Sequence, residues 1–120
     1  MSTQLDIFGQ PETGKMLRDN GMKQAVDHAD EVTPRWSEEA YKFAKRYILY
    51  YEYFMTEDIR EMASGIVPDP PSFRAWGAIM VRLAKEGLIR KAGFSPVKNA
   101  KAHMAFAIRW QSLIYKNYSL

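Results

Sequence analysis

The pattern of apolar and polar residues changes once along this chain, from helical spacing to strand spacing at Gly87. Before Gly87, apolar residues recur every three or four positions, as in amphipathic helices. The run Pro68-Asp69-Pro70-Pro71 interrupts this region, because proline excludes helix and forces a stiff turn. We therefore predict helices over residues 15–31 and 37–54, from Thr56 to the Ser64-Gly65 pair, and between Ser72 and Gly87.

Short polar signals mark the ends of these helices. Ser37 and Thr56 each stand before two acidic residues, so each is a candidate cap followed by charges that suit the positive end of a helix dipole. Thr13 is the candidate cap of the first helix, although the Asn20-Gly21 pair favours a break or a delayed start. Gly87 fits the left-handed position that commonly ends a helix.

After Gly87 the apolar residues alternate with polar ones, which is typical of strands. We predict a strand over residues 88–94, a basic loop over 95–102 and a returning strand over 103–110, with Met104, Phe106, Ile108 and Trp110 on one face. The last stretch, residues 111–120, is apolar enough for a short helix that either covers the core or meets a second copy of the chain. The sequence leaves both open.

This order of elements predicts a mainly α fold with a small β-hairpin, namely a winged helix-turn-helix with an extra N-terminal helix. Two helices joined by a tight turn cannot bury their apolar faces alone, so the preceding helix and the hairpin complete the core. We expect a flexible tail over residues 1–13, an N-terminal helix and linker over 14–36, the winged-helix domain over 37–111 and a C-terminal extension over 112–120.

Composition limits the classes of protein to which the chain can belong. Its 120 residues, 47% of them apolar, suit one compact domain. The absence of cysteine excludes disulfides, cysteine-ligated metals and thiol chemistry. The longest uncharged apolar run, Tyr47 to Tyr51, is far shorter than the roughly 20 residues of a membrane helix, and the start lacks the features of a signal peptide. We expect a soluble cytoplasmic protein with no membrane partner.

Charge is distributed unevenly along the chain. Residues 1–36 hold 4 basic and 6 acidic side chains (net −2), residues 37–70 hold 4 and 7 (net −3), and residues 71–120 hold 9 and 1 (net +8). The last segment, whose single acid is Glu86, creates a field that attracts polyanions such as DNA. The alternative is a basic face that only keeps the protein soluble.

The helix between Ser72 and Gly87 is the candidate recognition element. If its apolar stripe from Trp76 to Leu83 enters the core, the opposite face carries small and basic residues that suit the major groove of duplex DNA. There arginine can read guanine, lysine can neutralise phosphate, and small residues allow close approach. These candidates are Arg74, Gly77, Ala78, Arg82 and Lys85. The alternative is a solvated helix face with ordinary surface cations.

The predicted hairpin adds a cationic wing to this helix. A loosely held hairpin suits contacts to the phosphate backbone better than reading of bases. Its candidates are Arg90, Lys91, Lys98, Asn99 and Lys101. We expect salt-sensitive binding with modest sequence preference, unless the protein forms a homodimer.

No constellation of residues predicts an enzyme. The cluster Asp27-His28-Asp30-Glu31 has the residue types of a metal site, but on a helix His28 points away from the acids, so a solvated helix end is the better interpretation. Glu57 and Asp58 stand where a helix start favours acids for stability. We therefore expect no catalytic residues, no metal and no cofactor.

Three runs of the sequence resemble small winged-helix proteins encoded by phages and prophages. They are Pro70-Pro71-Ser72-Phe73-Arg74-Ala75-Trp76-Gly77, then Gly87-Leu88-Ile89-Arg90-Lys91-Ala92-Gly93-Phe94, then His103 before Ile108-Arg109-Trp110. The similarity in order extends over residues 14–111. It implies a DNA-associated role in phage replication or transcription regulation, inside a bacterial host cell.

The N-terminal segment Gln4, Leu5, Asp6, Ile7 and Phe8 resembles the pentapeptide by which bacterial replication and repair proteins dock on the DNA polymerase sliding clamp. In such a dock the apolar side chains enter a groove and Gln4 sets the register, although Ile7 replaces the commoner leucine. A clamp peptide beside a DNA-binding domain would raise the effective concentration of both contacts. The alternative is a tail that packs on its own domain.

A rival interpretation keeps the fold and changes the partner. A winged-helix adaptor could hold an acidic protein surface with the same cations, while the tail holds the sliding clamp. The salt dependence of duplex affinity distinguishes the two, because release of counterions from DNA gives a steep negative slope.

Overall fold

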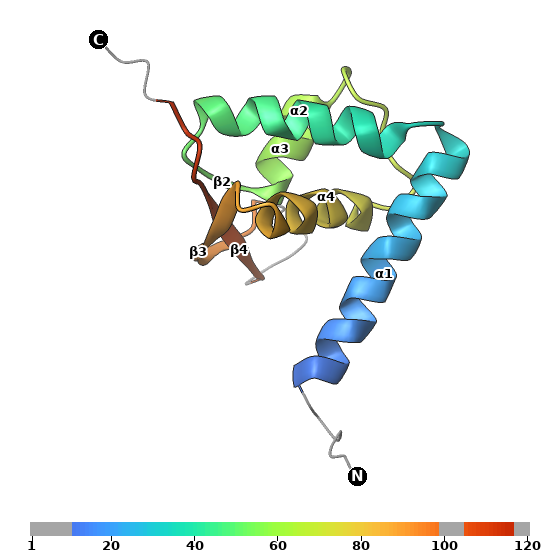
Figure 1. Cartoon of the computed structure of the whole chain (residues 1–120), viewed down its shortest axis with the longest axis horizontal. Coiled ribbons are helices and arrows are strands. Elements are labelled where there is room, and N and C mark those ends of the chain that lie inside the picture. Colours follow the sequence, from blue (N-terminus) through green and yellow to red (C-terminus); the bar gives the residue numbers. More distant parts are fainter. Residues whose placement is uncertain (1–10, 99–104, 117–120) are drawn as a thin grey trace.

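Four helices and three strands make up the part of the chain that the structure describes. The computed structural model describes residues 11–98 and 105–116, with residues 11–19 described by their backbone alone. Its elements are α1 (Pro11–Val32), α2 (Trp36–Tyr50), β2 (Tyr53–Met55), α3 (Thr56–Ala63), α4 (Arg74–Lys85), β3 (Ile89–Pro96) and β4 (Phe106–Ser112), as drawn in Figure 1. None of these helices has the length and apolar character needed to cross a bilayer.

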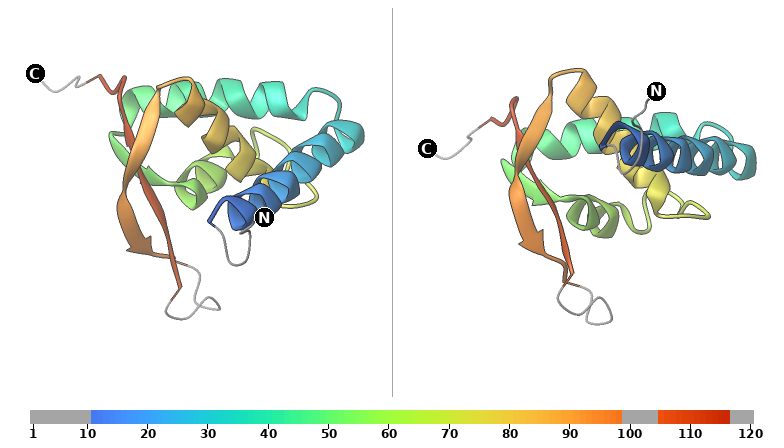
Figure 2. Two further views of the ribbon diagram at one scale, coloured as in Figure 1. Left: turned by 60° about the horizontal axis from the view of Figure 1, so that its bottom comes forward. Right: turned by 90° about the horizontal axis from the view of Figure 1, so that it is seen from below.

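The three strands form an antiparallel sheet in the order β2-β4-β3, so the last strand of the chain lies in the middle. The short strand β2 pairs Phe54 with Trp110 of β4. The longer pair starts with Ile89 opposite Ser112 and ends with Pro96 opposite Phe106. The helices lie on one side of this sheet, and the β3–β4 hairpin extends past them (Figure 2).

Two tryptophans form the centre of the core. The rings of Trp36 and Trp76 meet edge to face with centroids 5.3 Å apart, and each residue is 1% exposed. The indole N–H of Trp36 donates to the carbonyl of Pro68 at 2.7 Å, which holds the proline-containing loop against α2. At the other end of α2, the Ser112 hydroxyl donates to the carbonyl of Ile48 at 2.7 Å and so joins the sheet to the helix.

The structure confirms the short helix, the helix after the proline run and the hairpin. α3 starts at Thr56, but its N-cap is Met55 rather than the predicted Thr56. The carboxylate of Asp58 accepts the backbone N–H of Met55 at 2.8 Å, which satisfies a free donor at the helix start. Gly87 has a φ of 78°, so the predicted left-handed end of α4 is confirmed. The buried residues of α4 include the predicted Trp76 and Leu83.

The two longer helices differ from the prediction. α1 begins at Pro11, earlier than the predicted start at Lys15, and it continues through Asn20-Gly21. The prediction of a break was wrong: Gly21 lies inside the helix, where a Cβ would be 3.0 Å from a guanidinium nitrogen of the Arg74 side chain. α2 ends at Tyr50 rather than near Phe54. Phe54 instead joins a strand, because pairing with β4 overrides its helical spacing.

The C-terminal prediction was also wrong as far as residue 116. Gln111 and Ser112 extend β4, and residues 113–116 contain no helix. Their backbone is hydrogen-bonded to other elements: the N–H of Leu113 donates to the carbonyl of Leu88, and that of Lys116 to the carbonyl of Leu49, both at 2.9 Å. The bond of Lys116 takes up a donor that a helix over these residues would use.

The two strands of the hairpin also differ from the prediction in their first and last residues. β3 continues to Pro96, inside the predicted loop, and β4 begins at Phe106 rather than at residue 103. Trp110 is buried as predicted, whereas Phe106 is 61% exposed because the hairpin has there passed the edge of the helices. Met104 lies outside the described residues.

Candidate nucleic-acid interface

The outer face of α4, predicted to be open for DNA, is crossed by α1. Gly77 faces Met22 of α1 so closely that a Cβ on Gly77 would lie 3.4 Å from the Met22 methyl carbon. Ala78 and Val81 are half-buried and line a groove of about 320 Å³ together with residues of α1, among them Val26. The small residues at this face therefore admit a neighbouring helix of the same chain, which the sequence analysis did not foresee.

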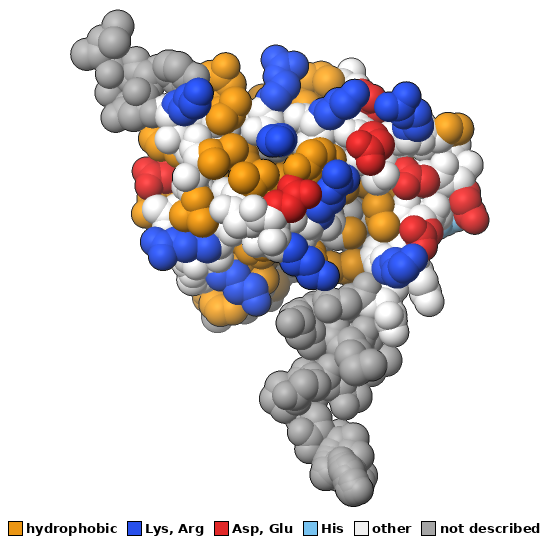
Figure 3. All heavy atoms as spheres, viewed as in Figure 1, with side chains coloured by type: hydrophobic (Ala, Val, Ile, Leu, Met, Phe, Trp, Pro, Cys, Tyr) orange, Lys and Arg blue, Asp and Glu red, His pale blue; other side chains and the backbone are white. Residues whose placement is uncertain are grey.

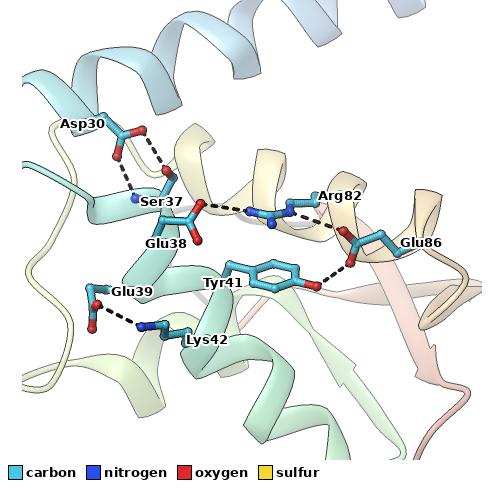
Figure 4. A network of polar contacts seen from close by, with 8 residues as sticks. All are labelled: Asp30, Ser37, Glu38, Glu39, Tyr41, Lys42, Arg82 and Glu86. Atoms are coloured by element: carbon cyan, nitrogen blue, oxygen red, sulfur yellow. Dashed lines mark hydrogen bonds and ion pairs between the residues drawn. The ribbon is translucent and has the colours of Figure 1, made fainter.

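Arg82, the second arginine of the predicted recognition helix, takes part in a local network with α2 (Figure 4). Its guanidinium lies 3.7 Å from a carboxylate oxygen of Glu38 and 3.5 Å from one of Glu86, and it stacks 3.7 Å from the centroid of the Tyr41 ring. Two carboxylates therefore share one positive charge. Arg82 links α4 to α2 and is a poor candidate for reading a base.

Tyr41 completes this network from the other side. Its hydroxyl donates to Glu86 at 2.5 Å. This hydrogen bond lowers the pKa of the Glu86 carboxyl and raises the pKa of the Tyr41 hydroxyl. Glu86 therefore stays ionised close to Arg82, so the one acid of the basic C-terminal segment neutralises one of its candidate DNA-binding cations.

On the hairpin, the candidate cations divide between the two faces of the sheet. Lys91 pairs with Trp110 and so lies on the same face of the sheet as that buried ring, and it is exposed on β3 at the edge of the sheet. Arg90 lies on the opposite face, and its Nε–H donates to the side-chain oxygen of Gln111 at 2.7 Å. Neither cation has a carboxylate within ion-pair distance among the described residues.

Lys98 has a structural role that the sequence analysis missed. Its ammonium pairs with Asp58, and its backbone N–H donates to a carboxylate oxygen of Glu57 at 2.9 Å. The contact with Asp58 raises the pKa of Lys98. The acids expected to stabilise the start of α3 thus also hold the end of β3, and Lys98 is paired rather than free for phosphate.

Of the remaining candidates, the structure describes two, and the others lie outside the described residues. Arg74 and Lys85 are exposed at opposite ends of α4, about 17 Å apart at 1.5 Å per residue, and neither has a carboxylate partner among residues 20–98 and 105–116, whose side chains the structure describes. Asn99, Lys101 and the tail residues Gln4, Leu5, Asp6, Ile7 and Phe8 lie outside the described residues. The blue cations of Figure 3 are correspondingly spread over the face and interspersed with acids.

A polar row on the uncovered face of the sheet was not predicted. Arg109 places its guanidinium 4.3 Å from the centroid of the Tyr53 ring, and the amide nitrogen of Gln111 donates to Glu52 at 3.0 Å and to the Tyr53 hydroxyl at 3.2 Å. This row depends on strand β2. The sequence signal that could have found it is the β-prone run Tyr53-Phe54-Met55 directly before a capped helix.

The acidic cluster near the end of α1 is divided among separate interactions. Asp27 pairs with Lys23 at 2.8 Å, and Nδ1 of His28, which was predicted to point away from the acids, lies 3.2 Å from a carboxylate oxygen of Glu31. Asp30 instead accepts the backbone N–H and the hydroxyl of Ser37, both at 2.7 Å, and so holds α1 to α2. Within residues 20–98 and 105–116, no group of three or more potential ligands could hold a metal ion.

Comparisons with protein families, with curated proteins and with solved structures find no match to this chain.

Proposed function

We propose that this protein is a winged-helix protein of phage or prophage type that binds duplex DNA through the corner between the end of α4 and the base of the β3–β4 hairpin. The order of elements supports the fold: after α1 come a helix, a strand, two helices and a hairpin, with the first strand pairing to the last. In this interpretation α3 and α4 are the helix-turn-helix pair and the hairpin is the wing.

A fold alone does not define a function, so the proposal depends on a particular site. The observation that carries it is the pair Lys85 and Lys91, which lie six residues apart on either side of the Gly87 turn and are both exposed, whereas Arg90 lies on the opposite face of the sheet. No carboxylate pairs with them in the described residues. Exposed cations without acidic partners are the groups that neutralise phosphates.

The position of α1 determines whether α4 can enter the major groove of DNA or only approach the sugar–phosphate backbone. A helix is about 10–12 Å in diameter, and the major groove is about 12 Å wide. With α1 against its outer face, α4 belongs to a layer roughly two helices wide, which the groove cannot admit. We therefore propose that the corner contacts the sugar–phosphate backbone, and that sequence preference is weak.

The test measures duplex affinity by fluorescence anisotropy over about 50–200 mM salt. The logarithm of the affinity falls linearly with the logarithm of the salt concentration. The double variant Lys85→Ala with Lys91→Ala should make this slope less steep by about 1.8, because each phosphate contact contributes about 0.9. The matched control removes two exposed cations from α2, Lys42→Ala with Lys45→Ala, and should keep the slope of the unmodified protein.

Two results would count against this function. Equal slopes for both double variants would show that the corner does not contact phosphate. Flat, weak binding of the unmodified protein at low salt would instead support the adaptor interpretation, in which an acidic protein surface meets these cations.

A further inference from the structure

A groove along the outer side of α2 belongs to none of the surfaces described so far. Two adjoining hollows of about 610 and 250 Å³ share the side chains of Phe43, Arg46 and Ile66. The first continues along α2 to Leu49, and the second extends between Tyr50 and Met62 of α3. These six residues define what we call the α2 groove.

The α2 groove exposes an unusual amount of apolar surface. Ile66 is 69% exposed, Tyr50 57% and Met62 49%. Scattered apolar residues are normal on a protein surface, but several that gather around one hollow mark an interaction site. Here they come from α2, α3 and the turn after α3.

Ile66 is held in its exposed position by the backbone. Its N–H and that of Val67 both donate to the carbonyl of Ala63 at 2.9 Å, and Gly65 takes a φ of 83° to allow the turn. Val67 is 6% exposed and anchors the turn in the core. The groove wall is therefore formed before any partner arrives, which lowers the entropic cost of binding.

The charge around the groove has one prevailing sign. Three cations line the larger hollow, Lys42, Lys45 and Arg46, against the single acid Glu39, so the lining carries a net charge of +2 (3 − 1). Glu39 lies 3.8 Å from Lys42. Arg46 also lines the smaller hollow, which contains no acid, and it has no carboxylate partner within the described residues.

We propose that the α2 groove binds an acidic amphipathic segment of a partner protein. Apolar side chains of the segment lie between Ile66 and Tyr50, and its carboxylates meet Lys42 and Arg46. An amphipathic helix places apolar side chains on one face at the spacing that such a groove requires and leaves acids at its edges. This inference does not depend on DNA binding.

Two other occupants fit less well. A second copy related by a two-fold axis would set the same patch against itself and oppose cation to cation. A nucleic acid would satisfy Arg46 and stack on Phe43 and Tyr50, but it would leave the exposed aliphatic side chains of Ile66 and Met62 without an apolar partner. The exposed aliphatic side chains of Ile66 and Met62 and the net positive charge together favour an acidic, apolar peptide.

The probe is a fluorescein-labelled peptide of about four helical turns with leucines along one face and glutamates elsewhere. One control peptide replaces every glutamate by lysine, and another has the same composition with the leucines dispersed around the helix. Anisotropy titration of the full chain should show the first peptide binding at least about 10-fold more tightly than either control.

Variants then locate the site. Ile66→Ser and Arg46→Glu should each lower the affinity for the acidic peptide by about 10-fold, as expected for residues central to an interface. The matched controls are Leu113→Ser, an apolar residue 49% exposed elsewhere, and Lys91→Glu at the corner. Both should leave peptide affinity unchanged, and circular dichroism checks that each variant is folded.

The inference is overturned if the three peptides bind equally, or if Ile66→Ser and Leu113→Ser behave alike. It is also overturned if sedimentation shows a dimer that Ile66→Ser dissociates, which would assign the groove to a second copy, or if Ile66→Ser weakens oligonucleotide binding. Because Lys91→Glu alters the corner and Ile66→Ser the groove, failure here is distinguishable from failure of the proposed function.

Discussion

The two faces of α4 are filled in different ways. The inner face buries Trp76, Ile79, Met80 and Leu83, each no more than 2% exposed. The outer face presents Gly77, Ala78 and Val81 to α1 and borders a groove of about 320 Å³. One helix thus takes part in a dense core and in a looser contact.

The difference shows how α1 is attached. Of residues 20–32 of α1, Ala29 alone is fully buried, and it lies near the end that Asp30 bonds to Ser37. Farther along, α1 meets α4 through half-buried residues such as Met22. We infer that the inner face carries most of the stability, whereas the outer face decides what can approach α4.

The largest expected effect on stability comes from a substitution on the inner face of α4. Trp76→Ala should lower the free energy of unfolding by about 3–5 kcal/mol, because it removes a large buried ring that packs against Trp36. Val81→Ala on the outer face should cost about 1 kcal/mol or less, since Val81 is half-buried. Urea unfolding followed by circular dichroism measures both, and equal losses would remove the contrast between the faces.

A second variant crowds the outer face. Gly77→Leu adds a side chain where a Cβ alone would already touch Met22, and should destabilise the protein by about 1–3 kcal/mol. Hydrogen exchange should show faster exchange of α1 amides around Met22, with little change in α2. Met22→Ala, which opens the same contact instead of crowding it, should have the smaller effect. Unchanged protection of α1 in Gly77→Leu would contradict the close packing of these helices.

The smallest expected effect on stability concerns the side of α4 that faces α2. The Tyr41 hydrogen bond holds the pKa of Glu86 below its usual value of 4.5, so this contact stabilises the fold above that pH. Its contribution is lost as the pH falls through the lowered pKa in the folded protein.

Tyr41→Phe should therefore have a lower melting temperature than the unmodified protein at pH 7. This gap between the two melting temperatures should narrow as the pH falls below about 4.5. Thermal melts at several pH values measure this gap. Tyr115→Phe, whose hydroxyl has no hydrogen bond in the described residues, is the control and should show no gap. A constant gap for Tyr41→Phe would show that Glu86 is not the partner.

The covered outer face also explains why the candidate site was predicted only in part. Helical spacing correctly separated Trp76 and Leu83 from Gly77 and Arg82, because that division depends on neighbours within one helix. Spacing could not tell whether the outward residues meet water, DNA or another helix. A glycine and an alanine suit each of these neighbours.

The same limit applies to the cations. Lys98 and Arg82 are basic in any fold, but their pairing with Asp58 and Glu38 connects residues that are 40 and 44 positions apart in the chain. Sequence separation of this kind carries no local signal. The exposed corner formed by Lys85 and Lys91 became distinguishable from the paired cations only once these partners were located.

Local chemistry by itself determined the short capped helix, the turn at the proline run, the left-handed residue at Gly87 and the change to alternating spacing after it. Each depends on backbone geometry or on side chains a few residues apart. The tertiary structure alone decided that Phe54 joins a strand, that α1 covers the outer face of α4 and that acids neutralise part of the basic surface. These outcomes depend on which distant segments meet, and hydrophobic burial and strand pairing select that across the whole chain.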